Sequence, residues 1–174
     1  MFPARFQLVA AMNPCPCGWD GDPAGRCSCR PGIGERYRAR VSGPLLDRID
    51  LWLELPRVPP DELVHGPEPE SSAAVAARVA AARRVQVERP WRRLNARLSG
   101  RALRAAAGMD RLGEARAVAL AEHAGLSARA TERLLRVART VADLDRADRV
   151  LPVHLEESAR YRPPRLVAEG RRGG

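Results

Sequence analysis

The composition of the chain changes abruptly across residues 58–71, a stretch rich in proline and acidic side chains. All four cysteines precede this stretch, together with short apolar runs that glycine and proline interrupt. Alanine- and arginine-rich segments with helical spacing follow it. Because proline-rich polar segments are typical of connections between domains, we predict a linker at 58–71. The chain is therefore expected to contain two regions of different architecture.

The second region reads as a series of helices. Serine or aspartate N-caps predict helices over about 72–87, 99–107, 110–124 and 127–144, and a further helix is expected over about 152–161. In the fourth helix one face is apolar, with Ala130, Leu134, Val137, Ala138, Val141 and Leu144. The opposite face carries Arg129, Arg133 and Arg136. We predict an all-α domain over 72–162 and a disordered tail over 163–174.

The first region reads as part of an α/β structure. Residues 6–12 form an apolar run that ends at Asn13 and Pro14. Such a run fits a strand buried on both faces of a parallel sheet, and proline ends it. Alternating residue types predict a second strand over 49–55, after a short helix near 35–41 and a helical turn at 45–48. We predict that residues 1–57 contain the last strands of an α/β core.

The cysteines occur as Cys15-Pro-Cys17 and Cys27-Ser-Cys29, within a glycine-rich loop over 14–32. Four thiolates can hold one zinc ion tetrahedrally, and glycines allow the tight turns that this needs. Free cysteines and a redox pair are the alternatives, because the C-x-C spacing is less specific than C-x-x-C. Four cysteines leave no open position for catalysis. We therefore predict a structural zinc site.

The formal charge of +9 favours polyanionic partners such as nucleic acids. All 30 basic residues are arginine, however, and alanine, glycine and proline are abundant, which is typical of a GC-rich genome. The charge alone is therefore weak evidence for DNA binding. No apolar segment approaches the roughly 20 residues that span a bilayer, and no secretory signal is recognisable. We expect a cytoplasmic protein without a membrane partner.

Two polar residues stand where they can meet a ligand. Asn13 follows the first predicted strand, and an amide at the carboxyl end of a buried strand can orient a water. It also fits a turn asparagine before proline. Arg48 lies between Asp47 and Asp50 on a short turn, from which a guanidinium can reach the phosphate of a neighbouring subunit. An ion pair within the chain explains Arg48 equally well.

Three segments carry a family resemblance. Residues 6–18 read Phe-Gln-Leu-Val-Ala-Ala-Met-Asn-Pro-Cys-Pro-Cys-Gly, and residues 42–51 read Ser-Gly-Pro-Leu-Leu-Asp-Arg-Ile-Asp-Leu. The third segment contains Leu-Ser-Ala-Arg-Ala at 126–130 and Arg-Val-Ala-Arg-Thr-Val-Ala-Asp-Leu at 136–144. Together they resemble the magnesium-chelatase-like AAA+ proteins of the YifB/ComM type. The resemblance covers roughly residues 2–162 and implies the remnant of an AAA+ core followed by an all-α helical lid.

The resemblance also implies residue roles. Asn13 matches sensor 1, which orients the attacking water near the γ-phosphate of ATP. Arg48 matches the arginine finger, which acts across the ring interface. Arg129 matches the sensor-2 arginine of the lid, and Arg136 is the second candidate for that role. Members of this family are hexameric ATPases, and ComM-type proteins are helicases that act on branched DNA in recombination.

The chain departs from the family in one respect. It has no lysine and therefore no P-loop lysine, and no acidic Mg²⁺-binding strand precedes Asn13. The sequence begins at what resembles an internal point of the ATPase core, so we predict no ATP hydrolysis by the chain alone. ATP and Mg²⁺ are expected only in the context of a complete core, and the expected partner is a homo-oligomer or the missing P-loop half. The alternatives are a free-standing zinc-binding nucleic-acid module that uses the Arg129/Arg133/Arg136 face, and an adaptor that docks into a ring of other subunits.

Overall fold

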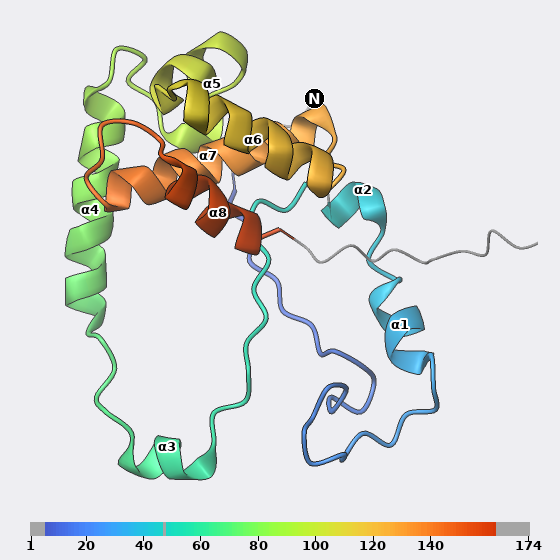
Figure 1. Cartoon of the computed structure of the whole chain (residues 1–174). Helices are drawn as coiled ribbons and strands as arrows, with labels where there is room; N and C mark the ends of the chain where they lie inside the picture. Colours follow the sequence, from blue (N-terminus) through green and yellow to red (C-terminus); the bar gives the residue numbers. More distant parts are fainter. Residues whose placement is uncertain (1–5, 47, 163–174) are drawn as a thin grey trace, which may run out of the picture. The chain divides into compact units, whose positions relative to one another are not determined.

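A computed structural model describes residues 6–46 and 48–162. The chain divides into two compact units, 1–46 and 47–174, which are considered separately. In the first unit a long loop precedes two short helices, α1 (Ile33–Arg38) and α2 (Gly43–Leu46). The second unit contains α3 (Pro60–His65), α4 (Ser72–Glu88), the 3-10 turn η1 (Asn95–Arg97), α5 (Gly100–Ala107), α6 (Arg111–His123), α7 (Ala128–Leu144) and α8 (Pro152–Arg160) (Figure 1).

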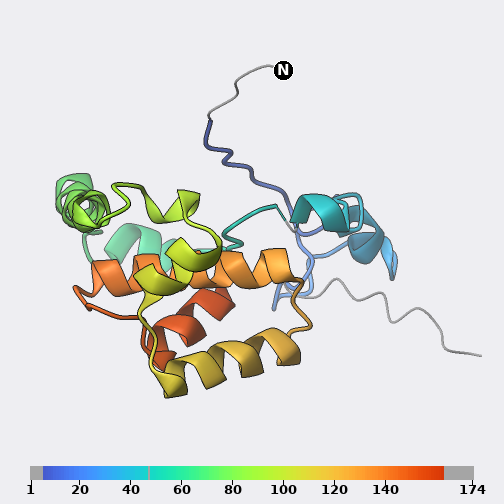
Figure 2. The same ribbon diagram turned by 90° about the horizontal axis from the view of Figure 1, so that it is seen from above.

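Helix α7 is the centre of the second unit. It packs against α4, α5, η1 and α8, and α6 packs in turn on α8. Figure 2 shows α7 between α5 on one side and α8 on the other. The apolar stripe predicted for this helix supplies much of the core, with Leu134 and Ala138 fully buried. Leu144, at the end of the stripe, is 38% exposed, because the helix ends there at the surface.

The predicted helix starts are confirmed in the second unit. The side chains of Ser71, Asp110 and Ser127 accept hydrogen bonds from backbone N–H groups three residues on. Each bond satisfies a donor that the first turn of a helix leaves unpaired. Ser99 occupies the N-cap position of α5 without such a side-chain bond. The all-helical character predicted for 72–162 is therefore observed, and the predicted tail over 163–174 lies outside the described residues.

The two predicted strands are not observed in the described part of the chain. Residues 6–12 and 49–55 have no regular secondary structure, and Val9 and Leu55 are 84% and 88% exposed. A strand needs a neighbouring strand for its backbone hydrogen bonds, and a single segment cannot supply one. The prediction of an α/β remnant over 1–57 is thus not supported by the residues that are described.

The segment after Asp47 lies against the helical unit. The backbone N–H of Trp52 donates to the Tyr161 carbonyl at the end of α8 (2.8 Å). Asp50 forms an ion pair with Arg133 of α7 (3.2 Å). The Arg162 guanidinium donates to the Ile49 carbonyl (3.4 Å). Residues 48–55 are therefore held by the ends of two helices, although their side chains Leu51, Leu53 and Leu55 remain exposed.

Candidate functional site

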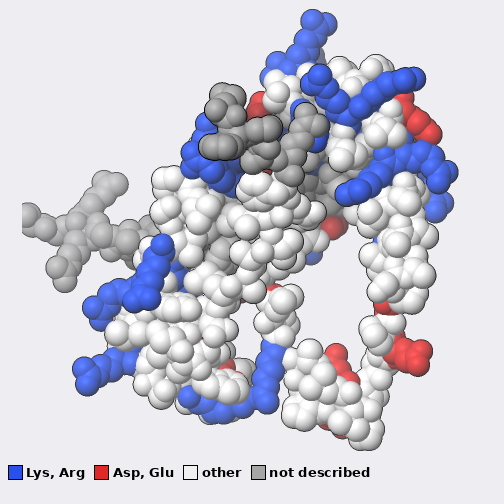
Figure 3. Space-filling model, turned by 180° about the vertical axis from the view of Figure 1, so that it is seen from behind, with Lys and Arg blue, Asp and Glu red and all other residues white. Residues whose placement is uncertain are grey.

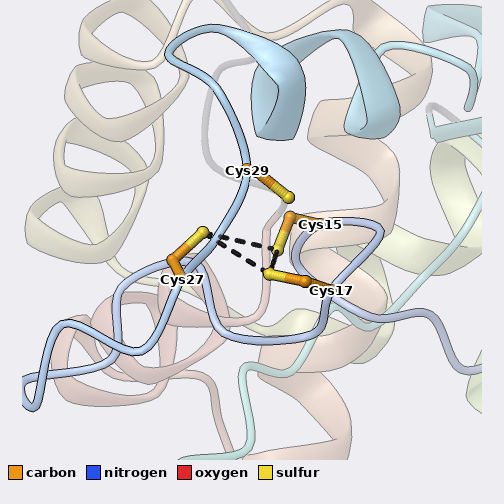
Figure 4. A group of neighbouring side chains, drawn as sticks. All are labelled: Cys15, Cys17, Cys27 and Cys29. Atoms are coloured by element: carbon orange, nitrogen blue, oxygen red, sulfur yellow. Dashed lines mark hydrogen bonds between the residues drawn. The ribbon is translucent and has the colours of Figure 1, made fainter.

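The four cysteines of the first unit converge on one point (Figure 4). The Sγ atom of Cys15 lies 3.3 Å from that of Cys17 and 3.9 Å from that of Cys27. Cys17 and Cys27 are 3.6 Å apart between their Sγ atoms, and all four sulfurs, including that of Cys29, lie within 4.8 Å of one another. Cys15 is fully buried, and the other three are partly buried.

This spacing fits a metal ion. Zinc binds thiolates at about 2.3 Å, so the sulfurs of a tetrahedral site lie about 3.8 Å apart. The observed separations of 3.3–3.9 Å fall close to that value. All donors are soft thiolates, which select zinc over hard cations such as Mg²⁺. The residues present therefore fit the predicted structural zinc site.

Tight turns and ion pairs shape the loop. The N–H of Gly18 donates to the Cys15 carbonyl (3.0 Å), and Gly18 adopts φ = 82°, a conformation that favours glycine. From α1, the Arg38 guanidinium donates to the Pro14 carbonyl (2.9 Å) and pairs with Asp20. These contacts position the first cysteine pair relative to the helix that follows the second pair.

The thiols of the cluster differ in acidity. A hydrogen bond from the Trp19 backbone, together with further hydrogen bonds, lowers the pKa of Cys17 to about 6, although desolvation acts in the opposite direction. A backbone hydrogen bond from Cys17 tends to lower the pKa of Cys29. Thiol hydrogen bonds with Cys17 and Cys15, together with desolvation, outweigh it and raise that pKa to about 12. Cys17 is thus the thiol that ionises most readily, and a thiolate is the form that binds metals.

Asn13 and Arg48 are both exposed to solvent. Asn13 belongs to the first unit and lies beside the cysteine loop. The Nδ2 atom of Asn13 would be 3.9 Å from a Cβ atom added to Gly18. Arg48 belongs to the second unit and lies in a turn. Asp47, the other predicted neighbour of Arg48, lies outside the described residues. Neither side chain is packed away from solvent, so both can meet a further molecule.

Arg129 is exposed in the first turn of α7. It lines a surface groove of about 530 Å³ between the N-terminal ends of α5 and α7, together with Gly100, Leu103, Arg104, Ala128, Thr131, Glu132 and Leu135. The carboxylate of Glu132 in this groove accepts a hydrogen bond from the Gly100 N–H (2.9 Å). The groove therefore presents two guanidinium groups and one carboxylate that is already paired.

Arg136 and Arg133 are less accessible than the helical spacing predicts. The Arg136 Nε donates to the Leu98 carbonyl (2.8 Å), its Nη2 pairs with Glu132 (3.1 Å), and its side chain is 19% exposed. Arg133 is 11% exposed and pairs with Asp50. The expected solvent-facing surface of Arg129, Arg133 and Arg136 is thus reduced to Arg129, because Arg133 is engaged by Asp50 and Arg136 by the Leu98 carbonyl and Glu132.

Sequence reasoning missed a buried charged pair in α7. Arg139 and Asp143 have side chains that are 0% exposed. Two nitrogens of the Arg139 guanidinium donate to Asp143 Oδ1, at 3.0 and 2.8 Å. Its other hydrogen bonds reach the carbonyls of Ala106, Ala147 and Asp148. The i,i+4 spacing of an arginine and an aspartate indicates that the two can pair, but it does not indicate that the pair is buried.

The same carboxylate anchors the chain that follows α4. Asp143 also pairs with Arg89 and accepts a hydrogen bond from the Asn95 side-chain amide (2.8 Å). The Asn95 backbone N–H in turn donates to Gln86 of α4 (3.1 Å). Asp143 therefore joins the C-terminal end of α4, η1 and α7 through one buried, hydrogen-bonded network, which fixes the backbone between residues 86 and 95.

None of the described helices has both the length and the apolar character that crossing a membrane requires.

Comparison with protein families assigns both regions. The profile of the magnesium chelatase subunit ChlI matches residues 1–63, and that of the ChlI C-terminal domain matches residues 69–162. The first match contains Asn13, Arg48 and all four cysteines, and the second contains Arg129 and Arg136. The break between the two matches falls within the predicted linker at 58–71.

Individual relatives agree. The protein YifB is 46% identical to this chain over 162 residues in both Salmonella typhimurium and Escherichia coli. The competence protein ComM of Haemophilus influenzae is 40% identical over the same length. Each alignment covers 92% of this chain but 31% of the relative, so the chain spans less than a third of these proteins. The chain belongs to the magnesium-chelatase-like family that includes YifB and ComM.

Proposed function

We propose that the chain supplies sensor 1, the arginine finger and sensor 2 to a ring-forming AAA+ ATPase whose ATP hydrolysis drives DNA remodelling of the branch-migration or helicase type. The observation that carries the proposal is the pair of family matches, which together include every residue assigned to these roles. Solvent exposure of Asn13, Arg48 and Arg129 supports it, since each must reach a bound nucleotide.

Phosphoryl transfer explains why these residue types are needed. Negative charge spreads over the γ-phosphate oxygens in the transition state, and catalysis consists mainly of positioning and electrostatic stabilisation. The Asn13 amide would orient the attacking water without changing its own protonation state. The Arg48 guanidinium would stabilise the developing charge from the neighbouring subunit, and that of Arg129 would contact the phosphates from the lid. Mg²⁺ and the P-loop belong to the rest of the core.

Two exposed apolar segments support the proposal that the chain works together with a further part of the ATPase core. Residues 6–12 and 49–55 present Phe6, Val9, Leu53 and Leu55 to solvent, each more than half exposed. In a complete core we expect these segments to pair as strands and to bury those side chains. The partner is either the P-loop half or further copies of a complete core in a hexamer, and we place the assembly in the cytoplasm.

The cysteine cluster has a structural role in this proposal. We expect one zinc ion on Cys15, Cys17, Cys27 and Cys29, which would hold the loop after Asn13 in place. Four thiolates leave no position for substrate, so the metal takes no part in hydrolysis. Its contribution would be to fix the backbone on which the sensor-1 amide stands.

A chimera tests the proposal. Residues 6–162 replace the matching part of the Escherichia coli YifB relative, and ATP turnover is measured by phosphate release. Arg48→Ala and Asn13→Ala chimeras are each expected to be inactive. A mixture of the two should recover activity, because some interfaces then combine an intact Asn13 with an intact Arg48 from the neighbouring subunit. Absence of recovery in mixed rings would contradict the role of Arg48 across the interface.

The second candidate function is a zinc-binding nucleic-acid module without ATPase activity. The thiol cluster favours this function, because it can supply the zinc site of such a module. The module also needs no nucleotide site. The two proposals differ in the chimera. A module predicts no effect of Arg48→Ala on ATP turnover, and it predicts nucleic-acid binding that is lost when the metal is removed.

A further inference from the structure

Seven arginines are concentrated in the 22 residues between positions 83 and 104, namely Arg83, Arg84, Arg92, Arg93, Arg97, Arg101 and Arg104. We call this set the 83–104 surface. Only one acidic residue, Glu88, lies in the same segment, and the eighth arginine, Arg89, is engaged with Asp143. Figure 3 shows basic side chains crowded over the part of the molecule that contains α4 and α5.

All seven arginines are exposed, and none pairs with another described residue through its side chain. Several other arginines of the second unit are paired, as in Arg78 with Glu70 and Arg116 with Glu156. The 83–104 surface therefore carries many positive charges, and Glu88 is the single carboxylate within its segment. Such a surface attracts polyanions and raises their rate of association.

The backbone beneath these arginines is fixed. The network of Asp143, Arg89 and Asn95 holds the chain between α4 and η1. Leu98 and Leu103, which follow, are 2% and 1% exposed in a small apolar cluster. Because the backbone is already ordered, binding through the exposed guanidinium groups adds no cost of loop ordering to the other costs of association.

The surface extends onto α7. Arg104 lines the same groove as Arg129, although the two residues are distant in sequence. The groove thus brings the Arg104 end of the 83–104 surface to the start of α7. A ligand with repeated negative charges can engage several of the seven guanidinium groups, whereas a single small anion would engage few of them.

The chemistry of the surface favours phosphates over an acidic protein. Protein interfaces need exposed apolar or aromatic anchors at their centre. Within 83–104 the exposed large hydrophobic side chains are Val85 and Val87, at 43% and 44%, and no aromatic side chain is among the exposed ones there. Guanidinium groups bind phosphate oxygens in a bidentate manner, and such contacts are independent of base sequence.

We propose that the 83–104 surface binds the phosphate backbone of a nucleic acid without sequence preference. The biological meaning of this contact rests on the proposed DNA-remodelling function, but binding itself requires neither ATP nor the rest of the core. The helical domain would thereby hold the nucleic acid through residues other than Asn13, Arg48 and Arg129.

Fluorescence anisotropy with the full chain tests the inference. The probes are labelled duplex and single-stranded oligonucleotides of two unrelated sequences, titrated at several salt concentrations. We expect binding to both sequences with equal affinity, weakening as salt rises. The triple variant Arg92→Gln, Arg97→Gln, Arg101→Gln should lower the slope of log K against log salt by about 3, since each phosphate contact contributes about 1.

A matched variant controls for net charge. Arg111→Gln, Arg146→Gln, Arg160→Gln removes the same charge from exposed positions outside the surface and should leave the slope unchanged. Circular dichroism confirms that both variants stay helical. Equal losses in the two variants, no binding by the parent at low salt, or equal competition by polyglutamate at matched charge would each overturn the inference.

The inference and the proposed function fail in different ways. In the chimera the triple variant should keep ATP turnover without DNA, because its residues lie outside the proposed nucleotide contacts. Loss of DNA binding with turnover intact supports the 83–104 surface. Intact turnover together with unchanged DNA binding rejects the surface and leaves the ATPase proposal standing.

Discussion

The two units of the molecule are stabilised in different ways. Among residues 6–46 the only buried apolar residues are Cys15 and Leu46, and the helices α1 and α2 bury almost nothing else. The second unit buries two apolar clusters, and Leu135 of α7 packs against both of them. Apolar burial can therefore hold the helical unit, whereas the first unit has little apolar burial, and we expect a metal ion on its four cysteines to take that place. The difference teaches that the two units of one chain rest on different interactions.

The largest expected effect is the loss of order in the first unit when the cysteine cluster is disrupted. Cys15→Ser removes the fully buried ligand, and we expect amide protection across 14–38 to disappear while α6, α7 and α8 keep theirs. Hydrogen exchange by mass spectrometry measures both units in one sample. A chelator should reproduce the effect in the parent. Unchanged protection over 14–38 in metal-free protein would show that the loop needs no metal.

The next largest effect is expected from removal of the buried carboxylate of the helical unit. Asp143→Ala leaves two arginines without their shared carboxylate, one of them fully buried, and should lower the free energy of unfolding by about 3–5 kcal/mol. Urea denaturation followed by circular dichroism measures it. The exposed pair of Glu70 and Arg78 provides the control, since Glu70→Ala should shift the curve very little. Equal shifts in the two variants would mean that the buried network is not needed.

Sequence periodicity predicted the helical unit well but not its polar interior. Capping residues and apolar spacing identified α4 to α8, because both are local properties of the chain. Arg139 and Asp143 occupy helical positions that read as surface, and their burial depends on carbonyls of Ala106, Ala147 and Asp148. Such tertiary partners leave no trace in local spacing.

Truncation of the apolar core should have a somewhat smaller effect. Leu134→Ala removes a side chain that is 1% exposed and should cost about 2–5 kcal/mol through lost burial and a cavity. Leu112→Ala on α6 is the matched control, because Leu112 is 69% exposed and should change stability by less than about 0.5 kcal/mol. Denaturation midpoints of the two variants give the comparison. Similar midpoints would contradict the central position of α7.

The smallest effect concerns the helix caps. Ser127→Ala removes the side-chain acceptor at the start of α7 and should cost about 1 kcal/mol. Ser99→Ala changes the same residue type at the N-cap of α5, where the side chain makes no capping bond, and should have almost no effect. Thermal unfolding distinguishes the two. A larger loss for Ser99→Ala would show that the capping bonds do not determine helix stability here.

The candidate site was predictable in part. The cysteine spacing identified the cluster, because a short loop keeps its four thiols close together in space. The arginine face of α7 was predicted too broadly, since Arg133 and Arg136 contact Asp50 and Leu98 from other segments. The 83–104 surface was missed, because arginine is frequent throughout the sequence and only the structure separates paired from unpaired guanidinium groups.

The roles of Asn13, Arg48 and Arg129 remain predictions from family membership. In the proposed ring, Asn13 of one subunit and Arg48 of its neighbour would meet at one nucleotide, together with the rest of the core.

ATP turnover by the Arg48→Ala chimera tests the central claim most directly. The chimera with residues 6–162 should hydrolyse ATP, and Arg48→Ala should reduce kcat by about a thousandfold or more, as expected for an arginine finger. Arg111→Ala, an exposed arginine on α6, should leave kcat unchanged. A chimera that assembles and hydrolyses ATP equally well with and without Arg48 would contradict the claim.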